Sequence, residues 1–122
     1  MINRQRVLII HEDRRTVDKL QELFVRSGYE AEIALTSEVG LSVIRERHMS
    51  VAVLGSELGP DGNWEFIKKL KESDPGLPVV LFNAPKLKGL SREARRVGVQ
   101  KLIAVPTDVE SVQKEAVKVM RN

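Results

Sequence analysis

Short runs of aliphatic residues alternate along this chain with segments whose apolar residues recur every three or four positions. Five runs predict strands: Arg6–Ile10, Ala31–Leu35, Val51–Leu54, Pro78–Phe82 and Leu102–Val105. Each run is too short for a helix, and its continuous apolar character is typical of a strand that is buried on both faces. Since strands that alternate with helices form parallel sheets, this pattern predicts an α/β fold with helices on both faces of the sheet.

The first three helical segments are marked by apolar spacing and by residues that favour helix ends. Val17, Leu20 and Phe24 recur at helical spacing, and Gly28 is a suitable residue to end that helix. Thr36 or Ser37 can cap a second helix, which carries Val39, Val43, Ile44 and Arg47. Asn63 can cap a third helix, on which Trp64, Ile67 and Leu70 share one face.

The last two helical segments differ in regularity. Gly89 weakens any helix that begins at Lys86, so we expect the stable part of the fourth helix to run from Leu90 or Ser91 to Val97. The stretch Thr107-Asp108-Val109-Glu110 matches a capping box, in which a hydroxyl and a carboxylate bond each other's backbone amides. It predicts the start of a fifth helix with an apolar stripe at Val109, Val112, Ala116 and Val119 or Met120.

Length and composition favour one domain that spans residues 1–122. The chain has 122 residues, of which 42% are hydrophobic and 30% charged, and it shows no repeat or linker. Five strands and this length suit a flavodoxin-like, doubly wound parallel sheet of strand order 2-1-3-4-5. No apolar run approaches the roughly 20 residues that span a bilayer. The chain has no cysteine, which excludes disulfides and thiol catalysis, and we expect a cytoplasmic location.

In a doubly wound sheet, the functional crevice lies beyond the carboxyl ends of the strands, near the point where the strand order reverses. The predicted strands bring four groups to that edge: His11-Glu12-Asp13, Gly55, Asn83 and Val105. These residues are therefore the candidates for a functional site.

Structural positions along the whole chain resemble the receiver domains of two-component response regulators. The matching residues are Gly28-Tyr29, Asp61-Gly62, Pro78, Ala84, Gly98 and Pro106. This resemblance implies the receiver fold and a cis peptide bond between Val105 and Pro106. It also implies that the chain can be the N-terminal module of a longer regulator, because receivers often precede an output domain.

The positions that carry the receiver's chemistry are substituted here. Carried over from the family, the magnesium-binding acidic pair falls on His11 and Glu12, and the phosphoacceptor aspartate falls on Gly55. The hydroxyl residue that contacts phosphate becomes Asn83, the conserved lysine becomes Val105, and the aromatic switch residue becomes Leu102. Since glycine has no carboxylate, no acyl phosphate can form at Gly55, and the resemblance implies a degenerate pseudo-receiver.

Two other groups at the crevice have alternative interpretations. Glu12 and Asp13 are weak candidates for a metal site, because a hard cation usually takes more ligands than two carboxylates. We therefore expect no metal and no cofactor. His11 is either a substitution that the mouth of the loop tolerates or a group that titrates near neutral pH and acts as a switch.

Basic residues gather around the predicted fourth helix. Lys86, Lys88, Arg92, Arg95 and Arg96 stand there against the single carboxylate of Glu93, and Lys101 follows. In receivers, the face formed by the fourth helix, fifth strand and fifth helix, with Leu102 on it, usually meets partners or a second copy. The cluster is either a solvated surface or a binding face for an acidic protein. The net charge of +3 is mild and no DNA-reading motif accompanies the cluster, so nucleic acid is an unlikely partner for this domain alone, and no membrane partner is indicated.

We interpret the chain as a phosphorylation-independent docking or signalling domain that acts by protein–protein contact in a two-component-type system. The alternative is a sensor for a small ligand or metal that uses the modified crevice at His11, Glu12, Asp13 and Asn83. We expect no enzymatic activity, because the crevice offers no nucleophile with an adjacent base.

Overall fold

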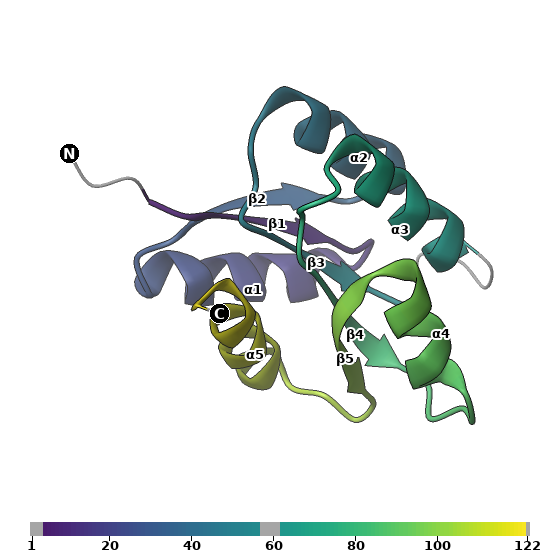
Figure 1. The fold of residues 1–122 in the computed structure, drawn as a ribbon. Coiled ribbons are helices and arrows are strands. Elements are labelled where there is room, and N and C mark those ends of the chain that lie inside the picture. The colour runs from purple at the N-terminus through teal and green to yellow at the C-terminus, as the bar shows by residue number, and fades with distance from the viewer. Residues whose placement is uncertain (1–3, 57–61, 122) are drawn as a thin grey trace.

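Five parallel strands pair in the order β2-β1-β3-β4-β5 in the computed structural model, which describes residues 4–56 and 62–121 (Figure 1). The strands are β1 (Arg6–Ile10), β2 (Glu30–Ala34), β3 (Val51–Gly55), β4 (Val79–Ala84) and β5 (Val99–Ala104). The helices are α1 (Arg14–Arg26), α2 (Ser37–Glu46), α3 (Gly62–Ser73), α4 (Leu90–Val97) and α5 (Val109–Arg121). This confirms the predicted flavodoxin-like, doubly wound fold with the strand order 2-1-3-4-5.

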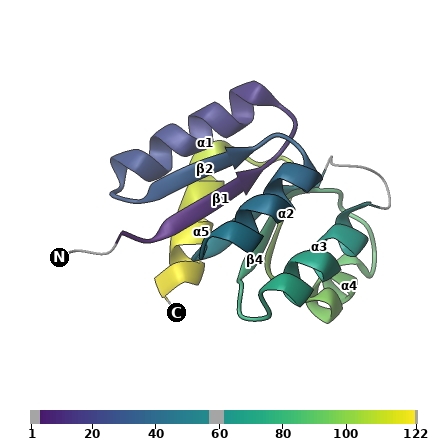
Figure 2. The same ribbon diagram turned by 90° about the horizontal axis from the view of Figure 1, so that it is seen from above.

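Helices cover both faces of the sheet, with α1 and α5 on one face and α2, α3 and α4 on the other (Figures 1 and 2). Alternate residues of each strand point to opposite faces. On β1, Leu8 and Ile10 pack with the α2–α4 layer, while Val7 and Ile9 pack with the α1 and α5 layer. Burial on both faces explains why the central strands read as continuous apolar runs.

The helix ends follow the sequence signals in most places. The hydroxyl of Thr36 accepts a hydrogen bond from the backbone amide of Val39 at 3.2 Å, so Thr36 caps α2 as predicted. Helix α4 runs from Leu90, with Gly89 and Gly98 at its two ends in left-handed conformations (φ +82° and +99°) that favour glycine. Among the described residues, no helix is long and apolar enough to cross a lipid bilayer.

Several predicted boundaries were wrong. Strand β5 begins at Val99, three positions before the predicted Leu102, because this edge strand exposes Gln100 and Lys101 and lacks a continuous apolar run. Strand β2 is one residue earlier than predicted, and Arg47 lies just outside α2. Helix α3 is assigned from Gly62, so Asn63 is within its first turn; the side chain of Asn63, like Asp61, lies outside the described residues.

The predicted capping box at α5 was also wrong. The hydroxyl of Thr107 donates to the backbone carbonyl of Ala104 at 2.6 Å and is turned away from the helix. Asp108 caps α5 instead, since its Oδ1 accepts a hydrogen bond from the backbone amide of Ser111 at 2.7 Å. This amide holds the pKa of the Asp108 carboxyl below its ordinary value.

We predict that Asp108 gives α5 a pH-dependent stabilisation. Because the pKa is lower in the folded state than in the unfolded state, the stabilisation is present above the ordinary pKa of 3.8 and is lost as the pH falls through the lowered value. Urea midpoints measured between about pH 6 and about pH 2 should fall more steeply for the wild type than for Asp108→Asn, whose amide oxygen still caps but does not titrate. Equal pH profiles for the two proteins would contradict the assignment of this cap.

Candidate functional site

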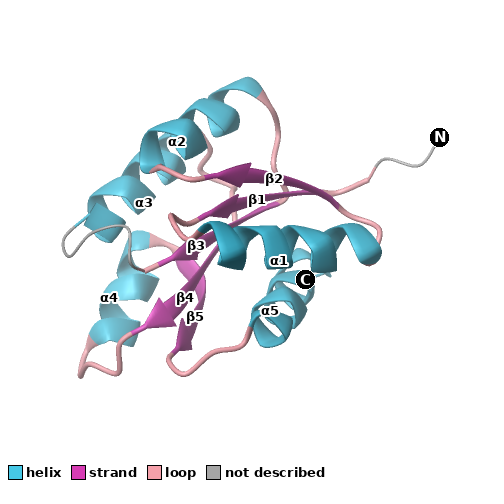
Figure 3. Ribbon diagram, turned by 180° about the vertical axis from the view of Figure 1, so that it is seen from behind, coloured by secondary structure: helices cyan, strands magenta, loops and turns pink. Residues whose placement is uncertain are grey.

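The ends of β1, β3 and β4 meet at the carboxyl edge of the sheet (Figure 3). Ile10 of β1 is in register with Leu54 of β3, and Gly55 is in register with Phe82 of β4. His11, which follows Ile10, therefore lies beside Gly55, and Asn83, which follows Phe82, lies at the same part of the edge. The structure brings together three of the residues that the sequence singled out there: His11, Gly55 and Asn83.

His11 is buried at this edge rather than open to solvent. Only 1% of its surface is exposed, and its ring centroid lies 5.4 Å from that of Phe82 at an angle of 46°. Its backbone amide donates to the carbonyl of Ala34 at 3.1 Å, and its Nδ1 accepts a hydrogen bond from the amide of Asp13 at 3.3 Å. The sequence placed His11 at the mouth of a loop and did not indicate this burial: the ring belongs to the packed interior.

The imidazole of His11 occupies the space into which a side chain at position 55 would project. A β-carbon built on Gly55 would lie 2.7 Å from both Cγ and Nε2 of His11, and closer still to Cδ2. Real β-carbons do not approach other atoms so closely, so any larger residue at position 55 requires the ring to move. Positions 11 and 55 are thus sterically linked.

Ser56 and Asn83 connect the ends of β3 and β4. The hydroxyl of Ser56 donates to the backbone carbonyl of Asn83, and the amide of Ser56 donates to the carbonyl of Phe82 at 3.0 Å. Asn83 has a φ of +58°, in the left-handed region that asparagine tolerates better than most residues. The hydroxyl of Ser56 is therefore engaged in a structural bond.

Among the described residues, the carboxylates near the crevice are not grouped to hold a metal. Glu12 is exposed, and Oδ2 of Asp13 accepts a hydrogen bond from the hydroxyl of Thr16 at 2.5 Å, within the start of α1. This bond is the main reason that the pKa of Asp13 is lower than usual. The described part of the chain contains no group of three or more carboxylate, histidine or cysteine side chains that is arranged to hold a metal. The Mg²⁺ that the receiver resemblance implies does not fit a buried imidazole, a glycine and a locally bonded aspartate.

The remaining crevice position carries an apolar side chain. Val105 is 39% exposed, and its amide donates to the carbonyl of Ala84 at 2.9 Å. The Val105–Pro106 peptide bond is cis, which confirms that prediction. Leu102 is partly buried against the α2–α4 side of the core. Neither side chain can donate a hydrogen bond or contribute a charge.

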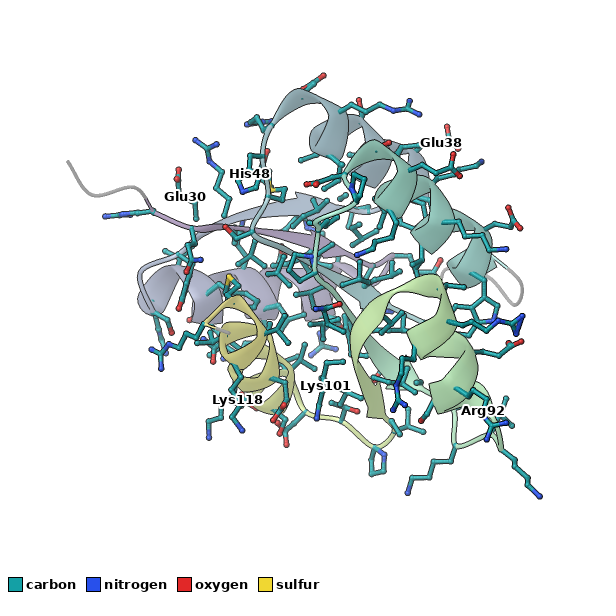
Figure 4. All side chains as sticks on the ribbon, in the orientation of Figure 1. Glu30, Glu38, His48, Arg92, Lys101 and Lys118 are labelled. Carbon is teal, nitrogen blue, oxygen red and sulfur yellow. The ribbon has the colours of Figure 1, made fainter. Side chains whose placement is uncertain are left out.

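The basic residues around α4 are exposed but do not form one face. Figure 4 shows Arg92 projecting from α4, with Lys101 on β5 towards α5. Arg95 lines a hollow of about 280 Å³ with Lys101 and Leu102 on β5. Arg96 instead lines a larger hollow of about 530 Å³ between α3 and α4.

Lys101 has a carboxylate partner that the sequence interpretation missed. Its Nζ lies 3.5 Å from Oε1 of Glu115 on α5. Burial alone would raise the pKa of Glu115, but a hydrogen bond from Lys118 and the charges of Lys101 and Lys118 outweigh it and lower that pKa. On the α5 side of the predicted partner face, the positive charge of Lys101 is therefore partly neutralised by Glu115.

Sequence comparisons give two regulatory proteins as relatives. No family model matches the chain. The chain is 30% identical over 91 residues to the transcriptional regulatory protein PcoR of Escherichia coli, covering 70% of this chain and 40% of PcoR. It is 21% identical over 106 residues to the photosynthetic apparatus regulatory protein RegA of Rhodobacter capsulatus, covering 87% of this chain and 58% of RegA. The chain thus spans about half the length of these curated relatives.

Solved structures agree closely with the backbone. A response regulator receiver domain protein (CheY-like) from Methanospirillum hungatei superposes with a TM-score of 0.87 at 21% identity, covering 98% of this chain and 95% of that one. The chain has the receiver fold of two-component response regulators. In this receiver fold, the crevice at the carboxyl edge is filled by His11.

We predict a strong energetic coupling between His11 and Gly55. Gly55→Ala should destabilise the protein by about 1–3 kcal/mol, because the new methyl group overlaps the imidazole. In a His11→Ala background the same change should cost less than about 0.5 kcal/mol, which a double-mutant cycle from urea unfolding measures directly.

Gly76→Ala is the matched control for this cycle. The nearest atom to a β-carbon at Gly76 is Oδ1 of Asp74 at 3.8 Å, an ordinary contact, so its cost should not depend on His11. If Gly55→Ala is equally destabilising with and without the imidazole, the two positions are not sterically linked.

Proposed function

We propose that this chain is a cytoplasmic, phosphorylation-independent docking domain on the receiver fold, which acts in regulation by protein–protein contact. The observation that carries this proposal is the imidazole of His11 packed over Gly55. This packing supports a structural role for the crevice in place of a chemical one.

The described residues at the crevice do not supply the groups that aspartyl phosphorylation needs, which supports this proposal. Such phosphorylation requires a carboxylate nucleophile, a divalent cation and a positive group beside the incoming phosphoryl oxygens. Gly55 supplies no nucleophile, Val105 supplies no charge, and the oxygens of Asp13 are directed to α1. The hydroxyl of Ser56 is no substitute, since it donates to the carbonyl of Asn83.

The same contacts favour a single state of the domain. The bond from Ser56 to Asn83 connects the end of β3 to the segment that leads into α4, and the ring of His11 packs on Phe82 of the same strand. A switch needs two arrangements that a ligand can bias. With the crevice filled and Leu102 in place of an aromatic relay, we infer that the surface around α4 stays in one arrangement.

The charge around α4 supports an acidic protein as the partner. Among the described residues, no carboxylate lies within ion-pair distance of Arg92, Arg95 or Arg96, so their charges are available to a partner. Exposed charges of one sign accelerate and orient association with a surface of the opposite sign, in a way that salt screens. The alternative, a sensor for a small ligand or metal in the crevice, would need the space beside Gly55 that the imidazole fills.

We predict that incubation with acetyl phosphate and Mg²⁺ leaves the intact mass of the protein unchanged, because position 55 has no carboxylate. Mass spectrometry of the native protein under non-acidic conditions checks this, with an active receiver domain as the positive control. A stoichiometric, base-labile phosphoryl adduct would overturn the proposal, and its location would identify the residue that replaces the missing acceptor.

A further inference from the structure

The largest hollow among those described above lies between α3 and α4, away from the crevice. Both helices lie on the same face of the sheet and next to each other (Figure 2). The hollow of about 530 Å³ is lined by Trp64, Lys68, Lys71 and Glu72 of α3 and by Glu93, Arg96 and Val97 of α4. Its volume is in the range of specific binding pockets.

The base of this α3–α4 groove is apolar and preformed. Trp64 is partly buried and packs against the core, and so does Val97. The aliphatic stem of Lys71 lies over Gly98, where a β-carbon would come within 2.9 Å of its Cε, and its Nζ donates to the carbonyl of Leu77 at 2.8 Å. Lys71 is therefore fixed, and it contributes carbon surface to the groove. A partly buried aromatic ring in a hollow is a typical anchor point for a partner.

The charge excess of the molecule is concentrated on the two helices that form this groove. Helices α3 and α4 carry six basic residues (Lys68, Lys69, Lys71, Arg92, Arg95, Arg96) and three carboxylates (Glu65, Glu72, Glu93), a net charge of six minus three, or +3. The whole chain has the same net charge of +3.

The groove is lined by both basic and acidic side chains, so it can discriminate between partners by the pattern of their charges. Nζ of Lys68 is 3.8 Å from Glu65, a long and exposed pair, and Arg96 has no carboxylate within 4.0 Å in the described ranges. Glu72 and Glu93 stand on the same walls. A partner must therefore place its carboxylates near Lys68 and Arg96 and avoid the two glutamates.

We propose that the α3–α4 groove binds a short helical segment of a partner protein, with an apolar residue seated against Trp64 and carboxylates that reach Lys68 and Arg96. Two neighbouring helices with an apolar hollow between them suit recognition of a helix in a groove. Helix α4 has eight residues and is about 12 Å long, so the segment makes contact over roughly two helical turns. This inference rests on the proposed docking role, and it locates the contact on the α3 side of α4 instead of the β5 side.

The test uses Trp64, which is the only tryptophan of the chain, as an internal reporter. The probe is a synthetic helical peptide of about 15 residues made of Glu, Ala and Leu, with Leu and Glu recurring on one face. We expect saturable change in Trp64 emission with this peptide, loss of the change at high salt, and no change with a peptide that has Lys in place of Glu.

Arg95 and Arg96 form a matched pair of variants, since they are neighbours with equal charge but line different hollows. Arg96→Glu should weaken binding of the acidic peptide by about tenfold or more, and Arg95→Glu by less than about threefold. Both residues are exposed, so both variants should keep the wild-type melting temperature and circular dichroism.

The outcomes separate this inference from the proposed function. Equal weakening by Arg95→Glu and Arg96→Glu would show that the charge of α4 matters but that the α3–α4 groove is not the site. Binding without any response of Trp64, or no binding of the acidic peptide at all, would also overturn the inference. The mass measurement with acetyl phosphate decides the phosphorylation-independent role separately, whichever of these results is obtained.

Discussion

The contact between the imidazole of His11 and the backbone at Gly55 determines what the carboxyl edge of this sheet can do. Parallel pairing of β1 with β3 places the two residues side by side, and the register leaves no freedom to separate them. The space beside Gly55 is then filled by a ring that belongs to the neighbouring strand. The ring therefore occupies the space that a side chain at position 55 would need. The two residues are sterically linked, because a histidine at position 11 in this orientation requires a glycine at position 55.

The consequences extend from the crevice to the surface. Phe82 packs against the imidazole, and Asn83, the next residue, is bonded through its carbonyl to Ser56, so the strand that leads to α4 is held at two consecutive positions. Helix α4 then presents its arginines without a carboxylate partner in the described ranges, whereas Lys101 on the other side of the surface is paired with Glu115. One of these arginines, Arg96, lines the groove between α3 and α4 that Trp64 also lines. The crevice is filled by His11, the end of β4 is held in place, and the arginines of α4 have no carboxylate partner among the described residues. These three features support the proposed docking role over that of a switch.

The sequence predicted the fold well and the site only in part. The strands β1, β3 and β4 were predictable because burial on both faces requires continuous apolar runs. The cap at Thr36 and the start of α4 after Gly89 follow from local chemistry. The start of β5 was missed because an edge strand keeps polar residues such as Lys101 on its exposed positions. The cap at Asp108 was missed because Thr107, the apparent cap, bonds backwards to Ala104. The glycine at position 55 was visible in the sequence, but the burial of His11 was not, since no local pattern tells which side chain fills a space between two strands.

The central claim is that the imidazole of His11 lies against Gly55 in solution, and proton NMR measures this most directly. The account predicts a strong nuclear Overhauser effect between the ring Hδ2 of His11 and the α-protons of Gly55, with those α-protons shifted by the ring current of the imidazole. It further predicts that both signals stay unchanged when Mg²⁺ is added. Absence of the Overhauser effect, together with a Gly55 α-proton shift typical of a solvent-exposed glycine, would show that the crevice is open and would contradict the account.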